Sequence, residues 1–281
     1  MESRDVVCIR VDATSYEEAV GLVAAWAQRQ ESRYVCVATV NQVMEAWDSA
    51  PLQAVMNTAD LVTPDGMPLV WALRALGVSG ATRVYGPYLT PRLLEEAERK
   101  GLPVGFYGAS PETLGKLLAT VRKEYPALEV AYAWSPPFRP LTPEEDDRVV
   151  QEMNASGARI LFVGLSSPKQ DAWMHRHRGR VRAVMLGVGA AFDFLAGTKR
   201  QAPQWMMPLG LEWLFRLATE PRRLWRRYLK HNPRFVVLFA RQWLRYRRTR
   251  RRRGLATAAA RGPADEAERP GEDPAGGGRG G

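Results

Sequence analysis

A carboxylate in a rigid turn is the group in this chain best suited to acid–base chemistry. Asp65 stands between Pro64, which restricts the preceding backbone, and Gly66, which frees the following one. A general base needs a carboxylate held in this way at the end of a strand. Asn41 ends the preceding strand and Thr39 lies two residues before it, so we expect them on the same rim. Pro-Asp-Gly alone is also a common turn.

Three apolar runs that end in glycine predict places where a ligand approaches the backbone. They end at Gly108, at Gly164 and at the pair Gly187 and Gly189. None matches the dinucleotide fingerprint or the phosphate-binding loop of nucleotide hydrolases, and no Asp-x-Asp pair is present to hold a divalent ion. A bound diphosphate would then be held by arginines, backbone N–H groups and helix N-termini.

Arg216, Arg223 and Arg226 are the arginines that we expect at such a ligand. Their spacings of seven and ten residues would place them on one face of a continuous helix. Pro221 is expected to break or kink that helix. A solvated basic face remains the alternative interpretation.

Positive charge is concentrated in one segment. Residues 216–253 contain fifteen Lys or Arg and one acid, a net charge of +14, whereas the whole chain carries +10. The remainder therefore carries −4. Aromatic residues alternate with these arginines, a pattern that suits the surface of an anionic membrane and also nucleic acid. The large aliphatic and aromatic residues favour the membrane, and we expect no nucleic-acid partner. Core packing is a further alternative.

The elements that position these residues alternate between strands and helices. A helix is expected after Thr142, because this N-cap is followed by Pro143. Continuous apolar strands between helices predict an α/β fold with a mainly parallel, Rossmann-like sheet and a C-terminal amphipathic basic helical appendage. Ligands bind such sheets beyond the carboxyl ends of the strands. Further strands are expected at 6–11, 33–40 and the three glycine-ended runs, and further helices at 15–26, 42–59, 114–125 and 170–177.

Composition divides the chain into three parts. We expect an α/β core over residues 1–204, a basic membrane-binding appendage over 205–253 and a disordered tail over 254–281. No apolar run approaches the ~20 residues that span a bilayer, and no N-terminal signal is visible. We therefore expect a cytoplasmic protein that associates peripherally with the inner face of the membrane.

The cysteines and histidines predict neither a metal nor a cofactor. Cys8 and Cys36 lie in apolar runs without a metal-binding spacing, so we expect buried, reduced thiols. His175 and His177 are two residues apart and would point away from each other on a helix, which is unsuited to shared ligation.

Several short motifs follow one another in order from Val6 to Arg227. Each is weak alone, but the ordered set is specific, and by it the sequence resembles the bacterial WecG/TagA/CpsF glycosyltransferase family (glycosyltransferase family 26). The motifs are Thr39-Val40-Asn41, Ala59-Asp60, Pro64-Asp65-Gly66, Arg83-Val84-Tyr85-Gly86, Gly108, Val163-Gly164, Ser167 to Trp173 and the series from Gly187 to Arg223.

The resemblance implies an inverting, metal-independent transferase. Such an enzyme moves a sugar, typically N-acetylmannosamine, from a UDP donor to N-acetylglucosamine linked through diphosphate to undecaprenol. Teichoic acid or exopolysaccharide synthesis would be the setting. The resemblance also implies that Asp65 is the general base, with Thr39 and Asn41 nearby.

The resemblance further assigns residues to the substrates. Arg216, Arg223 and Arg226 would neutralise the departing UDP from an appendage that closes over the site on the membrane. The nucleotide-sugar pocket would be formed by Gly66, Gly108, Gly164, Pro168, Gln170, Asp171, Gly187, Gly189 and Asp193.

Three positions depart from the family pattern. The family usually carries a carboxylate near the position of Tyr88, and that acceptor-side group is missing here. Asp171 stands where Glu is more frequent, which shortens the side chain and keeps its charge. Gln201 stands where Arg is common, with Arg200 beside it.

Two other functions remain open on the sequence. One is a peripheral protein that binds anionic lipid or nucleic acid through a non-catalytic α/β domain, and the other is a different sugar-nucleotide enzyme. The transferred sugar, the pathway, the lipid length and the oligomeric state are not encoded in any motif, and a homo-oligomer is one option.

Overall fold

The computed structural model describes the backbone of residues 1–260 and the side chains of residues 1–251. The chain divides into two compact units, one of Met1–Phe239 and one that begins at Ala240. Helix α11 (Pro221–Ala260) begins in the first unit and ends in the second. Its last residues, 254–260, belong to the tail expected from the sequence, and residues 261–281 of that tail lie outside the described residues.

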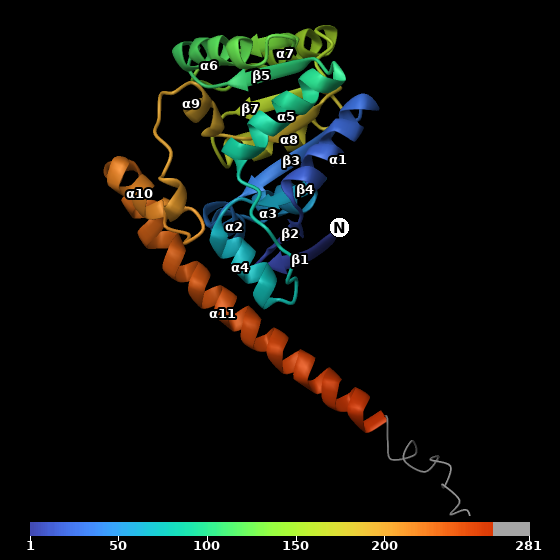
Figure 1. Cartoon of the computed structure of the whole chain (residues 1–281), viewed down its shortest axis with the longest axis vertical. Coiled ribbons are helices and arrows are strands. Elements are labelled where there is room, and N and C mark those ends of the chain that lie inside the picture. The colour runs from blue at the N-terminus through green and yellow to red at the C-terminus, as the bar shows by residue number, and fades with distance from the viewer. Residues whose placement is uncertain (261–281) are drawn as a thin grey trace, which may run out of the picture. The chain divides into compact units, whose positions relative to one another are not determined.

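The first unit is built on a six-stranded sheet in which every pairing is parallel (Figure 1). The strand order is β4-β3-β8-β7-β5-β6, so the chain first builds one edge and then crosses to the other. This confirms the expected Rossmann-like α/β core. The strands are β3 (Arg33–Ala38), β4 (Leu61–Pro64), β5 (Val104–Gly108), β6 (Val130–Trp134), β7 (Ile160–Gly164) and β8 (Val184–Gly187).

The N-terminal residues form a separate antiparallel hairpin. The expected single strand at 6–11 is wrong: β1 (Glu2–Val6) and β2 (Ile9–Ala13) pair with each other across a tight turn. Val7 adopts a left-handed backbone with φ of 63°, which reverses the chain inside an apolar run that contains no glycine. The side chain of Asp12 accepts a hydrogen bond of 2.8 Å from the backbone N–H of Val62 on edge strand β4.

Helices cover both faces of the sheet. Alternate strand residues, among them Val35, Phe106, Phe162 and Leu186, form one large apolar core with the helices of the first face. These helices are α1 (Tyr16–Gln28), α5 (Gly86–Lys100), α6 (Pro111–Glu124) and α9 (Ala191–Leu195). The other helices before the appendage are α2 (Val40–Asp48), α3 (Ala50–Asn57), α4 (Met67–Ala75), α7 (Pro143–Ala155) and α8 (Lys169–His177).

Capping residues explain several helix boundaries. Thr142 caps α7 with a reciprocal capping box and Pro143 in the first turn, as expected from the sequence. The continuous helix expected over 42–59 is instead two helices. Ser49 ends α2 and its side chain caps α3 by accepting from the N–H of Leu52, so the chain turns there.

The C-terminal part begins with a short 3-10 helix, η1 (Gln204–Met206), and continues with α10 (Glu212–Thr219) and α11. Helix α10 ends one residue before the Glu220–Pro221 junction, so the helix break expected at Pro221 is confirmed. Among the helices of residues 1–260, none combines the length and the apolar character that a membrane crossing needs.

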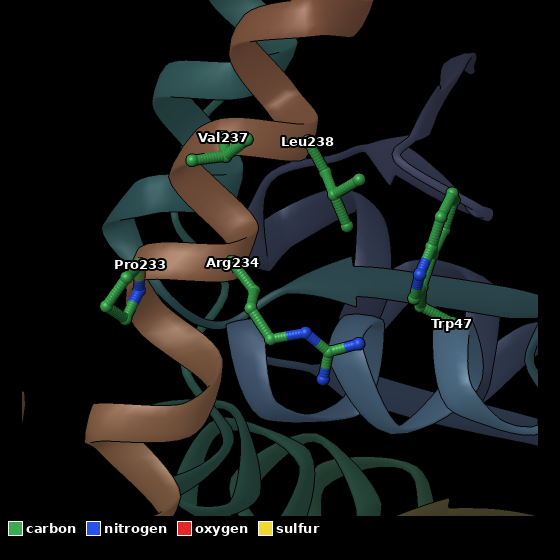
Figure 2. Close-up of a pocket in the computed structure, with 5 residues that line it drawn as sticks. All are labelled: Trp47, Pro233, Arg234, Val237 and Leu238. Carbon is green, nitrogen blue, oxygen red and sulfur yellow. The ribbon is translucent and has the colours of Figure 1, made fainter.

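The first part of α11 is attached to α2. Arg234 makes two hydrogen bonds to the carboxylate of Asp48, at 2.9 and 2.5 Å, and Leu224, His231 and Phe235 are buried. A hollow beside this contact is lined by Trp47, Pro233, Arg234, Val237 and Leu238 (Figure 2).

Candidate active site

Asp65 lies at the carboxyl end of edge strand β4, directly after Pro64, and its side chain is mostly buried. Its nearest charged partner is Arg83, from the loop between α4 and α5. The Nη2 atom of Arg83 is 3.5 Å from Oδ1 of Asp65 and 2.5 Å from Oε2 of Glu212, in the first turn of α10. One guanidinium therefore lies between a carboxylate of the core and a carboxylate of the C-terminal segment.

The protonation of Asp65 reflects this environment. Burial, and to a smaller extent the charge of Glu212, raise the pKa of Asp65, and the guanidinium groups of Arg83 and Arg216 oppose the rise. The resulting pKa is about 7. The base proposed from the sequence is thus a carboxyl group that titrates near neutral pH. A carboxylate with a pKa in this range is well matched to general base catalysis.

Two tyrosines lie near the same charges. Arg83 lies over the ring of Tyr85 at 4.2 Å, and the backbone N–H of Tyr85 donates to the hydroxyl of Tyr16 at 3.0 Å. The hydroxyl of Tyr85 is buried and lies close to Glu212. Burial raises the pKa of both tyrosines, so both are neutral at the pH at which Asp65 titrates.

Strand pairing brings Thr39 and Asp65 to the same rim of the sheet. Ala38 of β3 lies opposite Pro64 of β4, and the N–H of Asp65 donates to the carbonyl of Ala38 at 2.9 Å. The hydroxyl of Thr39, however, donates to Oε1 of Gln42 at 2.9 Å. Thr39 and Asp65 therefore share a rim, with Thr39 engaged locally as the N-cap of α2. The expected place of Asn41 at the end of the strand is wrong: β3 ends at Ala38, and Asn41 lies in the first turn of α2.

Gln42 links α2 to α8 through a buried polar chain. Its amide donates to the carbonyl of Val37 at 3.1 Å and to Oδ2 of Asp171 at 3.4 Å. The hydroxyl of Ser167 also donates to Oδ2 of Asp171, at 3.0 Å. Burial raises the pKa of Asp171 to about 6, and these hydrogen bonds oppose the rise. Asp171 of α8 thus accepts hydrogen bonds from residues that follow β3 and β7 in the chain.

Three oxygen acceptors near these strand ends have no partner in the protein. They are Oδ1 of Asn41, Oε1 of Gln170 and Oδ1 of Asp171, all buried. A buried acceptor without a partner is costly, so such atoms mark places where a ligand can donate. Hydroxyl and amide N–H groups of a sugar are donors of this kind.

The glycines at the ends of β5 and β7 touch each other. A Cβ added to Gly108, whose φ is +124°, would lie 2.6 Å from the backbone of Gly164, and one added to Gly164 would lie 2.6 Å from the Phe192 ring. After β5 the chain passes through α6 to β6, and after β7 it passes through α8 to β8. These two connections run in opposite directions along the sheet, because β6 and β8 lie on opposite sides of the β5–β7 pair. Crevices for ligands occur at such switch points.

The end of β8 forms a second close approach around Gln170. A Cβ on Gly187 would lie 2.7 Å from Cε of Met174 and 2.9 Å from Nε2 of Gln170. Gly189 has φ of +49° and also faces the Gln170 amide. Both glycines therefore leave room for the Gln170 side chain, which the family resemblance assigns to the donor pocket together with them.

Two of the expected pocket residues have backbone positions at helix starts. Pro168 is the N-cap of α8, and Gly66 is the N-cap of α4, directly after Asp65. Helix N-termini favour anionic ligands. Within residues 1–251 no cluster of three or more His, Cys, Asp or Glu side chains is arranged to hold a metal ion.

The three expected arginines take different positions. Arg216 faces the charges around Asp65. Arg223 forms an ion pair with Glu220, which lies 3.7 Å from Lys199, and Lys199 pairs with Asp193 at 2.9 Å. Arg226 is exposed and lies over the ring of Trp225. The structure therefore places Arg216 within electrostatic range of Asp65 and joins Arg223 to Asp193 through two other charged residues.

The cysteine prediction is confirmed in part. Cys36 is buried on β3, whereas Cys8 is half-buried in the hairpin turn, and neither forms a disulfide.

Sequence reasoning missed the roles of Arg83, Glu212 and Gln42. Arg83 was noted only as part of a motif. Glu212 is one of two acids in residues 205–253, and its isolation in a basic segment was the available signal. Gln42 follows Asn41 in the expected second helix and carried no signal, because its partner Asp171 is distant in sequence.

Comparison with known proteins supplies an independent line of evidence. The profile of the Glycosyl transferase WecG/TagA/CpsF family matches residues 4–249. The N-acetylglucosaminyldiphosphoundecaprenol N-acetyl-beta-D-mannosaminyltransferase of Bacillus spizizenii is 29% identical over 217 residues, which cover 77% of this chain and 82% of that protein.

Proposed function

The chain belongs to the WecG/TagA/CpsF family of glycosyl transferases, and from that premise we propose its substrates and its mechanism. The donor is a UDP-sugar, with N-acetylmannosamine as the sugar, and the acceptor is N-acetylglucosamine linked through diphosphate to undecaprenol. The acceptor and sugar follow from the name of the Bacillus spizizenii relative. The product serves cell-wall teichoic acid or exopolysaccharide synthesis. Membership of a transferase family goes against a non-catalytic binding protein.

The observation that carries the mechanism is the largely buried Asp65 beside Arg83, with Arg216 within electrostatic range. Asp65 takes the proton from the acceptor hydroxyl, whose oxygen attacks the anomeric carbon of the donor. The bond from that carbon to UDP breaks, and UDP leaves with the electron pair. Attack on the face opposite the leaving group inverts the configuration. A pKa near 7 leaves Asp65 sufficiently ionised and sufficiently basic at neutral pH.

The leaving diphosphate requires positive charge that is in place before the reaction. Arg216 is largely withdrawn from solvent and lies within electrostatic range of Asp65 and Glu212. Arg223 and Arg226 are exposed at the start of α11. We assign stabilisation of the departing UDP to these three arginines, without a metal ion. Fixed charges in a site that excludes water are effective in this role, which suits the largely buried Arg216.

The donor lies across the glycine-rich strand ends in this proposal. Gly108 lets the end of β5 approach Gly164 of β7, Gly164 leaves room for the Phe192 ring, and Gly187 and Gly189 leave room for Gln170. We place the nucleotide in the crevice beside these strand ends. The unpartnered acceptors of Asn41, Gln170 and Asp171 would receive hydrogen bonds from the sugar.

Association with an anionic membrane is supported by the exposed side of α11 within the first unit. Trp225, Leu229 and Val236 are 47%, 69% and 64% exposed, and their spacing of four and seven residues places them on one side of the helix. Arg222, Arg226 and Lys230 are also exposed and occur at intervals of four. A helix with an apolar and a basic stripe lies in the membrane interface, where the lipid-linked acceptor resides.

A release assay tests the proposed reaction. UDP release is measured from UDP-N-acetylmannosamine, UDP-N-acetylglucosamine and UDP-glucose, with and without a diphosphate-linked N-acetylglucosamine lipid analogue, in EDTA. We expect release that depends on the acceptor, occurs with one donor and is lost in Asp65→Asn but kept in Asp147→Asn, a surface control. Folded protein that releases UDP from none of the donors would overturn the assignment of the donor.

A further inference from the structure

Arg83 is shared unequally between two carboxylates. Its Nη2 atom is 2.5 Å from Glu212 and 3.5 Å from Asp65, and the three side chains are only 15%, 12% and 16% exposed. The Nε of Arg83 donates to the backbone carbonyl of Asp65, and its guanidinium rests on the ring of Tyr85. These contacts orient Arg83 so that its Nη2 atom lies closer to the carboxylate of Glu212 than to that of Asp65.

We propose that Glu212 is a positioning residue that draws Arg83 away from the Asp65 carboxylate and thereby keeps Asp65 able to accept a proton. Glu212 does not contact the reacting atoms in this proposal and acts through Arg83. The inference rests on the proposed role of Asp65 as base. It adds that a residue of the C-terminal segment, on α10, adjusts a base located on the core sheet.

The charges around Asp65 explain why this adjustment matters. Two cations face the carboxylate, Arg83 from the loop before α5 and Arg216 from α10. The other titratable groups around the Asp65 carboxylate carry no positive charge: they are the carboxylate of Glu212 and the hydroxyls of Tyr85 and Tyr16. A carboxylate held between two guanidinium groups is a weak base, because its ionised form is stabilised. Glu212 supplies the opposing negative charge.

The arrangement also links the base to the position of α10. Glu212 lies in the first turn of that helix, and Arg216 lies one turn later on the same side. The helix therefore brings to Asp65 both an arginine suited to the leaving group and an acid that counters the added positive charge. Arg216 alone would strengthen the leaving-group site and weaken the base.

The test is the pH dependence of kcat/KM in the full-length protein with the donor and acceptor analogue, from about pH 5 to about pH 9. In Glu212→Gln, Arg83 is free to pair with Asp65. We expect the acidic limb of the profile to move down by about one pH unit and the plateau to fall several-fold, because the base is weaker. Glu112→Gln removes the same charge from an exposed ion pair on α6 and should leave the limb in place.

The outcomes separate this inference from the proposed function. An unmoved limb in folded, active Glu212→Gln would overturn the positioning role while leaving Asp65 as base. If Glu212→Gln fails to fold, Glu212→Asp keeps the charge but withdraws it from Arg83, and the limb should move in the same direction by less. An unmoved limb in Glu212→Asp overturns the inference as well. Transfer that persists in Asp65→Asn would instead overturn the proposed base.

Discussion

The raised pKa of Asp65 predicts that this residue lowers the stability of the protein at neutral and alkaline pH. A carboxyl group whose pKa is higher in the folded than in the unfolded state contributes stability below its unfolded pKa, and this contribution is lost as the pH rises through the folded pKa. Asp65→Asn removes the charge and keeps the shape of the side chain. The variant should therefore gain stability relative to the natural protein as the pH rises.

The magnitude follows from the shift of the pKa from 3.8 to about 7. Each unit corresponds to about 1.4 kcal/mol, so full ionisation of Asp65 costs on the order of 4 kcal/mol in the folded state. About 1 to 2 kcal/mol of that cost is already present at about pH 5. Between about pH 5 and about pH 8, the stability of Asp65→Asn relative to the natural protein should therefore rise by about 2 to 3 kcal/mol.

Urea unfolding at the two pH values measures this difference directly, because all other titrating groups are common to both proteins. Asp147→Asn makes the same chemical change at a side chain that is 67% exposed, so its effect should be small and alike at both pH values. A stability difference between Asp65→Asn and the natural protein that stays constant from the lower to the higher pH would refute the argument. The ionised carboxylate would then not be destabilised by its surroundings.

Three further predictions concern the pocket, the leaving group and the membrane. Gly164→Ala should destabilise the fold by about 1 to 3 kcal/mol, because the new Cβ meets the Phe192 ring, whereas Gly115→Ala, in open space on α6, should be neutral or stabilising by urea unfolding. Arg216→Gln should lower kcat of transfer by about 100-fold or more with little loss of donor binding in a filter assay; equal losses in binding and turnover would contradict a role in the transition state. Leu229→Ser should weaken binding to phosphatidylglycerol vesicles, measured by sedimentation, by at least about 10-fold, because it removes a largely exposed apolar side chain that would insert into the membrane interface. Unchanged binding would contradict the orientation proposed for α11.

The strand and helix pattern was largely predictable from local sequence. Apolar runs that end in glycine formed β5, β7 and β8, because buried parallel strands are apolar on both faces. Local cues failed where the backbone departs from its usual preferences. The turn at Val7 requires a left-handed conformation from a β-branched residue, and the break at Ser49 depends on one side-chain cap inside a helical pattern.

The candidate site was predictable only in part. The rigid turn at Asp65 indicated a candidate base, and the glycines at the ends of apolar runs identified the ends of three strands. The relation of Thr39 to Asp65 was expected correctly at the level of the rim, because neighbouring parallel strands end together. The hydroxyl of Thr39 is bonded to Gln42 instead, and the choice between two nearby partners depends on distances that no spacing encodes.

The amino-acid sequence by itself determined the α/β architecture, the family and the identity of the candidate base, because periodicity, turn chemistry and ordered motifs are local properties. Only the tertiary structure decided that Arg83 lies between Asp65 and Glu212, which are separated by more than half of the chain. Burial and the signs of nearby charges determine a pKa, and both depend on which distant segments meet. The acid–base chemistry of Asp65 is therefore a property of the fold, although the three-residue turn Pro64-Asp65-Gly66 identifies the residue in the sequence.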